Sequence, residues 1–200
     1  MGAHPLSGSA RAGFVSPRLA LVPWLAVVAI GLSSCATIRH EDCPHVDWYQ
    51  LGVKDGREGA AESRLHEHRR ACRDAGVQPD ERRYLAGRSE GLRSYCTLPN
   101  ALAEGMAGRT YNRVCPGPLD AAFLEVNAAA HAVYDVRRRI RDLESSISSR
   151  ESQLRKRDLS DRDRDRLRSE IREMDRRRDT LRDDLYRHER NLDQVRQRYR

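Results

Sequence analysis

The chain has 200 residues, enough for one ordinary domain or two small units, which argues against a large multidomain enzyme. Hydrophobic residues make up 38% of it and charged residues 34%, with only two Phe and two Trp. This composition argues against a thick α/β core and favours an elongated helical protein. The formal net charge of +7 comes from arginines interleaved with acidic residues rather than gathered in a patch, so we expect no nucleic-acid partner.

Residues 1–34 are typical of a secretory signal peptide. Arg11 and Arg18 precede an apolar run over residues 19–31, and no acidic residue occurs before Cys35. The run is shorter than the roughly 20 residues that a membrane-spanning helix needs. An uncleaved membrane anchor is therefore the weaker alternative.

The sequence Leu-Ser-Ser-Cys at residues 32–35 resembles the lipobox of bacterial lipoproteins, in which a peptidase cuts before the cysteine. The thiol of Cys35 would carry diacylglycerol, and its amino group a further acyl chain such as palmitate. Because each buried CH₂ contributes about 0.8 kcal/mol, such an anchor is effectively permanent. Ala36, rather than Asp, follows the cysteine, which by resemblance to the lipoprotein sorting pattern predicts the periplasmic face of the outer membrane.

Three helices are expected in the module over residues 35–117. Asp47 can cap a first helix that begins at Trp48. A second apolar-periodic stretch covers residues 60–75 and ends at Gly76, a good C-terminal cap. Asp80 can cap a third helix, which runs to Cys96 before the Leu-Pro-Asn sequence at residues 98–100 stops it.

Four cysteines remain for disulfides in this module: Cys43, Cys72, Cys96 and Cys115. The periplasm is oxidising, so we expect two disulfides, for which counting alone allows three pairings. If consecutive helices are antiparallel, Cys72 lies near the start of the third helix and Cys96 about 24 Å away, at ~1.5 Å per residue. A bond between those two is geometrically poor. We favour Cys43 with Cys72 and Cys96 with Cys115.

A zinc site is the competing interpretation of the same segment. His66, His68 and Cys72 offer imidazole and thiolate ligands, and His68 lies one helical turn from Cys72. The spacing is loose and the chain has no Cys-x-x-Cys pair, so disulfides are favoured and no metal or other cofactor is expected.

A weak internal repeat places glycine pairs at an offset of 35 residues. Its members are Tyr49, Gly52, Asp55 and Gly56 in the first copy and Tyr84, Gly87, Glu90 and Gly91 in the second. Each pair clears one face of a helix at a cost of roughly 1 kcal/mol per glycine, so something should approach that face closely. We favour a neighbouring helix. The alternative is a groove for a ligand or peptide, with Asp55 and Glu90 at its edge.

Several segments with fixed residue types resemble the bacterial family called domain of unknown function 2799. They are Arg64-Leu-x-x-His68-x-x-x-Cys72, Pro79-Asp80-x-x-x-Tyr84-x-x-Gly87-Arg88-x-Glu90-Gly91-Leu92-x-x-Tyr95-Cys96, Gly105-x-x-Gly108-x-x-Tyr111-x-x-Val114-Cys115-Pro116 and residues 119–124. The match runs from about Cys43 into the start of the terminal helix. The family has Asn-Gly where this chain has Asn100-Ala101. The resemblance implies an envelope lipoprotein with no established activity, and it supplies no catalytic residues.

Residues 118–200 predict a long antiparallel coiled-coil hairpin. One helix runs from Pro118 to about Arg157, and its apolar positions largely keep a 3,4 spacing. A second helix continues that spacing on a seam that includes Arg178 and His188. If buried, these two residues must extend to the surface or pair with acids on the other arm; alternatively, they mark a contact with another protein. A cap at Ser160 separates the arms, each about 55 Å long at ~1.5 Å per residue. The alternative is one continuous helix that pairs with another chain.

The fold class expected is therefore all-α: a small disulfide-stapled helical head followed by a helical hairpin. We expect a lipid-anchored envelope protein with a structural or interaction role, which contacts the membrane through its anchor and an envelope protein through the hairpin. The alternative is a binding or sensing module for a metal, peptide or glycan fragment. No nucleophile elbow, metalloprotease helix or phosphate-binding loop occurs in the sequence, so we expect no enzyme.

Overall fold

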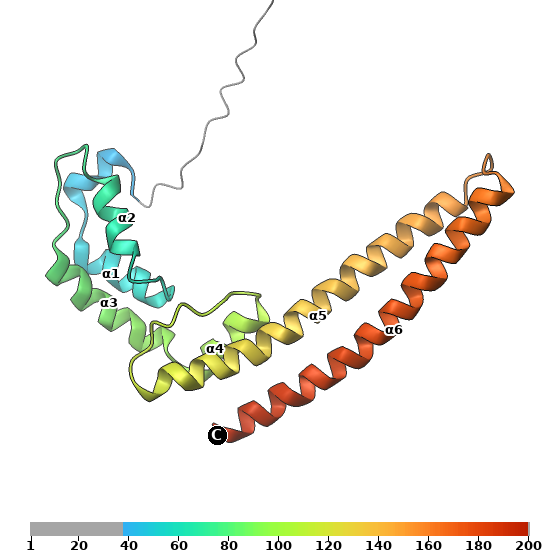
Figure 1. The fold of residues 1–200 in the computed structure, drawn as a ribbon. Coiled ribbons are helices and arrows are strands. Elements are labelled where there is room, and N and C mark those ends of the chain that lie inside the picture. The colour runs from blue at the N-terminus through green and yellow to red at the C-terminus, as the bar shows by residue number, and fades with distance from the viewer. Residues whose placement is uncertain (1–37, 200) are drawn as a thin grey trace, which may run out of the picture. The chain divides into compact units, whose positions relative to one another are not determined.

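The computed structural model describes residues 38–199 and shows an all-α fold, as predicted (Figure 1). Six α-helices and one 3-10 helix account for its regular structure, and no strand occurs within this range. The expected signal peptide and Cys35 lie outside the described residues. None of the described helices combines the length and the apolar character that crossing a membrane requires.

The head begins with the 3-10 helix η1 (His40–His45) and the helices α1 (Trp48–Arg57) and α3 (Glu81–Tyr95). Both predicted caps are present. The Asp47 carboxylate accepts the backbone N–H groups of Tyr49 and Gln50, and that of Asp80 accepts the N–H of Arg83. These bonds satisfy donors that the first helical turn leaves without partners.

Helix α2 (Arg64–Ala71) is shorter at both ends than the stretch 60–75 expected from periodicity. At its start, Gly59 adopts a positive φ of 62° and the Ala60 N–H bonds the Asp55 carbonyl, so the preceding residues close α1 instead of extending α2. At its end, Cys72 is the C-terminal cap and forms a disulfide. Gly76 has the expected left-handed conformation, with φ 66°, but lies in the following turn.

Helix α4 (Leu98–Met106) was not predicted, because the Leu-Pro-Asn sequence was interpreted as a stop signal. That interpretation was wrong. Proline lacks an N–H and fits the first turn of a helix, where no intrahelical acceptor exists. Thr97 caps the helix by accepting the Asn100 N–H at 3.3 Å. Helix α4 then packs against the long helix that follows.

Helices α5 (Pro118–Leu154) and α6 (Asp161–Arg198) run side by side in opposite directions, as the predicted hairpin requires (Figure 1). The Ser160 hydroxyl accepts the Asp163 N–H and caps α6. Ion pairs cross between the arms in antiparallel order: Arg137 with Glu189 at 2.7 Å, Glu144 with Arg182 at 3.6 Å and Arg150 with Glu170 at 2.8 Å. The alternative of one continuous helix is therefore wrong.

The predicted seam of the hairpin is buried or half-buried along its length. The apolar seam positions are Val126, Val133, Val136, Ile140, Leu143, Ile147 and Leu154 on α5, and Leu167, Ile171, Met174, Leu181, Leu185, Leu192, Val195 and Tyr199 on or at the end of α6. Arg178 and His188 are half-buried. Arg178 pairs with Asp175 of its own helix at 2.9 Å, so it satisfies its charge without an acid from the other arm.

Two apolar clusters form the core. The smaller cluster gathers Cys43, Trp48, Leu65, Cys72 and Tyr84 in the first half of the head. The larger cluster joins the end of α3 to α4, to the first half of α5 and to the last turns of α6. Its buried members include Tyr95, Ala101, Phe123, Val126, Val133, Leu192 and Val195.

Both disulfides form, with the pairing that we favoured: Cys43 with Cys72 and Cys96 with Cys115. They close segments with sequence separations of 29 and 19 residues. Restricting the unfolded chain by loops of this size stabilises a fold by about 3 to 4 kcal/mol, and the dependence on loop length is only logarithmic.

Replacing both cysteines of either pair with alanine should therefore lower the free energy of unfolding by similar amounts, about 3 kcal/mol for each pair. Changing both partners together leaves no free thiol to form a wrong bond. Urea denaturation of the two double variants measures the effect. A loss below 1 kcal/mol for either pair would show that its loop is already restricted in the unfolded chain.

Candidate functional site

The repeated glycines join α1 to α3, as the favoured interpretation predicted. A Cβ atom built on Gly52 would lie 2.1 Å from the Tyr84 carbonyl oxygen, and one built on Gly87 would lie 2.0 Å from that of Tyr49. Gly56 and Gly91 face each other in the same way, with built Cβ atoms 2.9–3.0 Å from the opposite Cα. The two backbones thus touch directly. The alternative of a ligand groove along these glycines is wrong, because the opposite helix fills it.

Residues later in α1 contact residues later in α3, so the two helices run parallel, with α2 between them in the chain.

The matching carboxylates of the repeat have different surroundings. Asp55 is buried, whereas Glu90 is half-buried and pairs with Arg93. Tyr49 is half-buried and Tyr84 fully buried.

Asp55 is the centre of a buried polar cluster. Its Oδ2 accepts a hydrogen bond from the Tyr84 hydroxyl at 2.7 Å and lies 2.7 Å from Nε2 of His68. Burial alone would raise the pKa of Asp55, but the bonds to His68 and Tyr84, with the charges of His68 and Arg64, outweigh burial and lower it. Burial and the bond to Asp55 raise the pKa of the Tyr84 phenol. Asp55, His68 and Tyr84 line none of four pockets found among the described residues, and we assign the cluster a structural role.

The lowered pKa of Asp55 predicts a loss of stability in acid. A carboxyl whose folded-state pKa is depressed contributes stability above its ordinary pKa of 3.8, and that contribution disappears as the pH falls through the lower folded-state value. Asp55→Asn should lower the free energy of unfolding at pH 7. It should also make that free energy depend less on pH in the acid range. Urea denaturation between pH 2 and pH 6 tests it, and an equal pH dependence for the variant and the parent would contradict the assignment.

The zinc interpretation of His66, His68 and Cys72 is wrong. The Cys72 sulfur is bonded to Cys43, and His68 is bonded to Asp55. His66 is exposed and its Nδ1 lies 3.0 Å from Nη1 of Arg69. Across residues 38–199, no group of three or more His, Cys, Asp or Glu side chains is placed to hold a metal ion.

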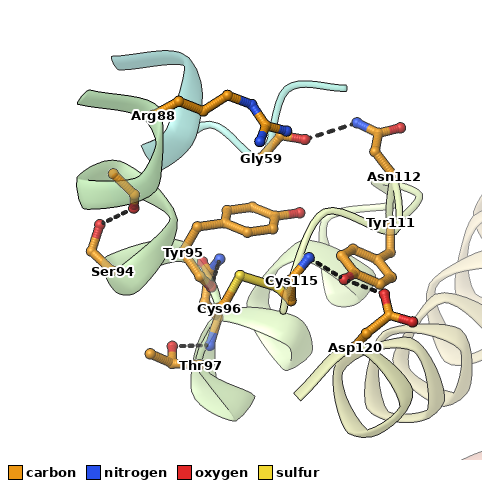
Figure 2. Close-up of a disulfide and its surroundings, with 12 residues drawn as sticks. Gly59, Arg88, Ser94, Tyr95, Cys96, Thr97, Tyr111, Asn112, Cys115 and Asp120 are labelled. Carbon is orange, nitrogen blue, oxygen red and sulfur yellow. Dashed lines mark hydrogen bonds between the residues drawn. A yellow bond between two sulfur atoms is a disulfide. The ribbon is translucent and has the colours of Figure 1, made fainter. Parts of the chain in front are cut away.

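The segment between α4 and α5 is fixed from several sides, as Figure 2 shows. Cys115 is bonded to Cys96 at the end of α3, and its N–H donates to the Tyr111 hydroxyl at 2.7 Å. That hydroxyl donates in turn to Asp120 of α5 at 2.7 Å. Burial and the bond to Asp120 raise the pKa of Tyr111 to about 12, so the phenol is a stable donor at neutral pH. The Asn112 amide donates to the Gly59 carbonyl at 2.9 Å.

The backbone of this segment is also conformationally unusual. Arg113 has a φ of 58°, which side-chain-bearing residues seldom adopt, and it is the only such residue other than glycine among those described. Its guanidinium pairs with Asp120 at 2.7 Å. A backbone held in this way supplies a rigid wall for whatever lies beside it.

A pocket of about 550 Å³ lies between this wall and helix α3. Its lining consists of Leu85, Arg88, Ser89, Leu92, Arg93 and Cys96 on one side and Val114, Pro116 and Leu119 on the other. Small-molecule sites have volumes of roughly 300–1,000 Å³ and mostly apolar walls with a few polar groups. This pocket has that character, and its lining includes two arginines and no acid.

Arg88 is the polar residue of the pocket that is most firmly held. Its side chain is only 8% exposed, and its Nη2 donates to the Ala60 carbonyl at 3.0 Å. Figure 2 shows the guanidinium beside Gly59 and above the ring of Tyr95. The Nε of Arg88 is buried and has no hydrogen-bond partner among the described residues. Buried polar groups normally have partners, so this unsatisfied donor is unusual.

Sequence reasoning missed this pocket. The glycines of α3 drew attention to the face that packs on α1, whereas the pocket lies along another stripe of the same helix. Leu85 and Leu119 gave a usable signal, because they are large apolar residues off the predicted packing faces, and they are 47% and 43% exposed. Nothing in the sequence indicated that Arg88 is buried.

Comparison with known proteins finds one family that is similar to the part of the chain containing the head and the pocket. Residues 47–131 match the family described as "Protein of unknown function (DUF2799)". This part of the chain is therefore similar to the DUF2799 family. No curated protein and no solved structure matches the chain.

The DUF2799 match confirms the resemblance stated from the sequence and begins at Asp47, close to the expected start at Cys43. It includes the glycine-paired helices, the Asp55 cluster and both walls of the pocket. It ends at His131, within α5, so most of the hairpin lies beyond the DUF2799 match.

Proposed function

We propose that the protein is a lipid-anchored lipoprotein of the bacterial cell envelope, whose terminal hairpin contacts another envelope component. The lipobox sequence at residues 32–35, after an apolar run, supports the anchor at Cys35. Two disulfides in the head support an oxidising compartment, because disulfides persist in exported proteins and are rare in the cytosol.

The interaction role is supported by the length of the hairpin, whose outer part extends beyond the larger core cluster. The larger core cluster takes in α5 as far as Val133 and α6 from Leu185 onward. From Val136 to Leu154 the helix continues for about 27 Å, at ~1.5 Å per residue, and packs against the other arm alone. This extension adds little to the core of the head. Its outward faces carry closely mixed charges that suit contact with a charged protein surface.

Tyr186 is a natural anchor for such a contact. Its side chain is 61% exposed, the most exposed of the large hydrophobic residues described. The guanidinium of Arg190 lies over its ring, 5.7 Å from the centroid. Tyrosine and arginine are the residue types most enriched where protein interfaces concentrate their binding free energy.

The anchor is tested by metabolic labelling with an alkyne-tagged palmitate. The parent chain should incorporate the label and fractionate with the outer membrane, whereas Cys35→Ala should lose both the label and the fractionation. Cys96→Ala/Cys115→Ala serves as a cysteine control that should keep the label. Incorporation by the Cys35→Ala variant would contradict the assignment of the anchor.

The interaction role is tested by shortening the hairpin without touching the head. Deleting residues 145–151 and 173–179 removes one heptad from each arm and preserves the seam register. The head should keep its thermal stability, while capture of the partner in the envelope should be lost. Unchanged capture by the shortened protein would move the contact to the base of the hairpin, near Tyr186, or to the head.

A further inference from the structure

The pocket beside the Cys96–Cys115 disulfide follows helix α3 as a largely apolar strip. Its residues on α3 recur at helical spacing from Leu85 to Cys96, a length of about 16 Å at ~1.5 Å per residue. Val114, Pro116 and Leu119 line the opposite side. Leu85 and Leu119 are both partly exposed, so the strip keeps apolar surface in contact with water until something covers it.

The polar groups of the pocket favour an anion. Both charged residues in the lining are arginines, Arg88 and Arg93, and Ser89 adds a hydroxyl. Arg93 is exposed and pairs with Glu90, but Arg88 is held in place and its buried Nε has no acceptor among the described residues. A carboxylate or phosphate group is the natural partner of two guanidinium groups that have no acid beside them in the lining.

The walls of the pocket distinguish an acyl chain from a peptide. One wall is the side of α3, whose backbone groups already bond within the helix, so it offers no edge with which an extended peptide could pair. An acyl chain needs only apolar contact along its length.

We propose that this pocket binds a single acyl chain with an anionic head, as in a long-chain fatty acid or a lysophospholipid. The chain lies along the strip between Leu85 and Leu119, and the head lies against Arg88. The proposal rests on the pocket alone and does not depend on the anchor at Cys35 or on the hairpin contact.

Photolabelling with a diazirine-bearing C16 fatty acid tests the proposal. The full chain is purified from membranes, reconstituted in phosphatidylcholine nanodiscs, labelled and digested, and the adducts are located by mass spectrometry. We expect adducts on residues 85–93 and 114–119. Unlabelled palmitate should suppress them at least tenfold, and hexadecanol, which lacks the charge, should not. Lysophosphatidic acid as a second competitor shows which head group is preferred, and suppression by either anion supports the site.

Two variants make the test specific. Leu85→Gln/Leu119→Gln changes two exposed side chains, so the fold should be retained while labelling falls at least tenfold. Leu124→Gln is the matched control, because Leu124 is also an exposed leucine near the start of α5 but does not line this pocket, and its labelling should be unchanged. Adducts outside the pocket, equal competition by hexadecanol, or undiminished labelling of the double variant would each overturn the proposal.

Discussion

Gly87→Ala should lower the free energy of unfolding by about 3 kcal/mol, although it adds only one methyl group. At an open helix position the same change would stabilise the protein by about 1 kcal/mol, because alanine has the higher helix propensity. Here the new Cβ would lie 2.0 Å from the Tyr49 carbonyl oxygen, so α1 and α3 must separate. The new methyl group would overlap backbone atoms of α1, which cannot change rotamer to make room as a flexible side chain can.

Ala86→Gly is the control for helix propensity. Ala86 is exposed on the same helix, so its replacement should cost only the propensity difference of about 1 kcal/mol. Urea denaturation of both variants at neutral pH compares them directly. A stabilised Gly87→Ala protein would mean that α1 and α3 do not meet through their glycines.

Phe123→Ala should be the most destabilising single truncation in the larger core cluster, at about 3 to 5 kcal/mol. Phe123 is 1% exposed and lies against two aromatic rings. Its ring centroid is 5.0 Å from that of Tyr95 and 4.4 Å from that of Tyr111. Its loss would therefore leave a cavity between α3, α5 and the segment that carries Cys115.

Leu124→Ala is the matched control for this truncation. Leu124 is the next residue on α5 and is 36% exposed, so its loss should cost well under half as much. Thermal denaturation followed by circular dichroism measures both variants. Equal losses would place Leu124, rather than Phe123, in the core.

The sequence predicted the parts of this fold that depend on repeated spacing or on local chemistry. Regular 3,4 spacing located the seam of α5 and α6, and the side chains of Asp47, Asp80 and Ser160 located helix starts. The glycine repeat was correctly attributed to a close helix pair, since a paired glycine face has few other physical uses. The length of α3 argued against a bond between Cys72 and Cys96, and the pairing favoured among the remaining two is the one that forms.

The parts that were missed depend on tertiary contacts. Helix α4 begins at a proline that local rules allow to start or to stop a helix, and its packing on α5 decides between them. Helix α2 ends early because Cys72 must reach Cys43. The pocket is formed by α3 and by a segment about 25 residues further along the chain, so neither wall alone indicates it. The burial of Arg88 results from that same juxtaposition.

The central claim is that the hairpin, and not the head, contacts an envelope partner. Photo-crosslinking in living cells from position 186, with a photoreactive amino acid in place of Tyr186, tests it most directly. Probes at Ser89 in the pocket and at Arg82 on the exposed face of α3 serve as comparisons. We expect a discrete protein adduct from position 186 that is absent from the shortened hairpin. No adduct at position 186, together with a protein adduct from Ser89 or Arg82, would contradict the account and place the contact on the head.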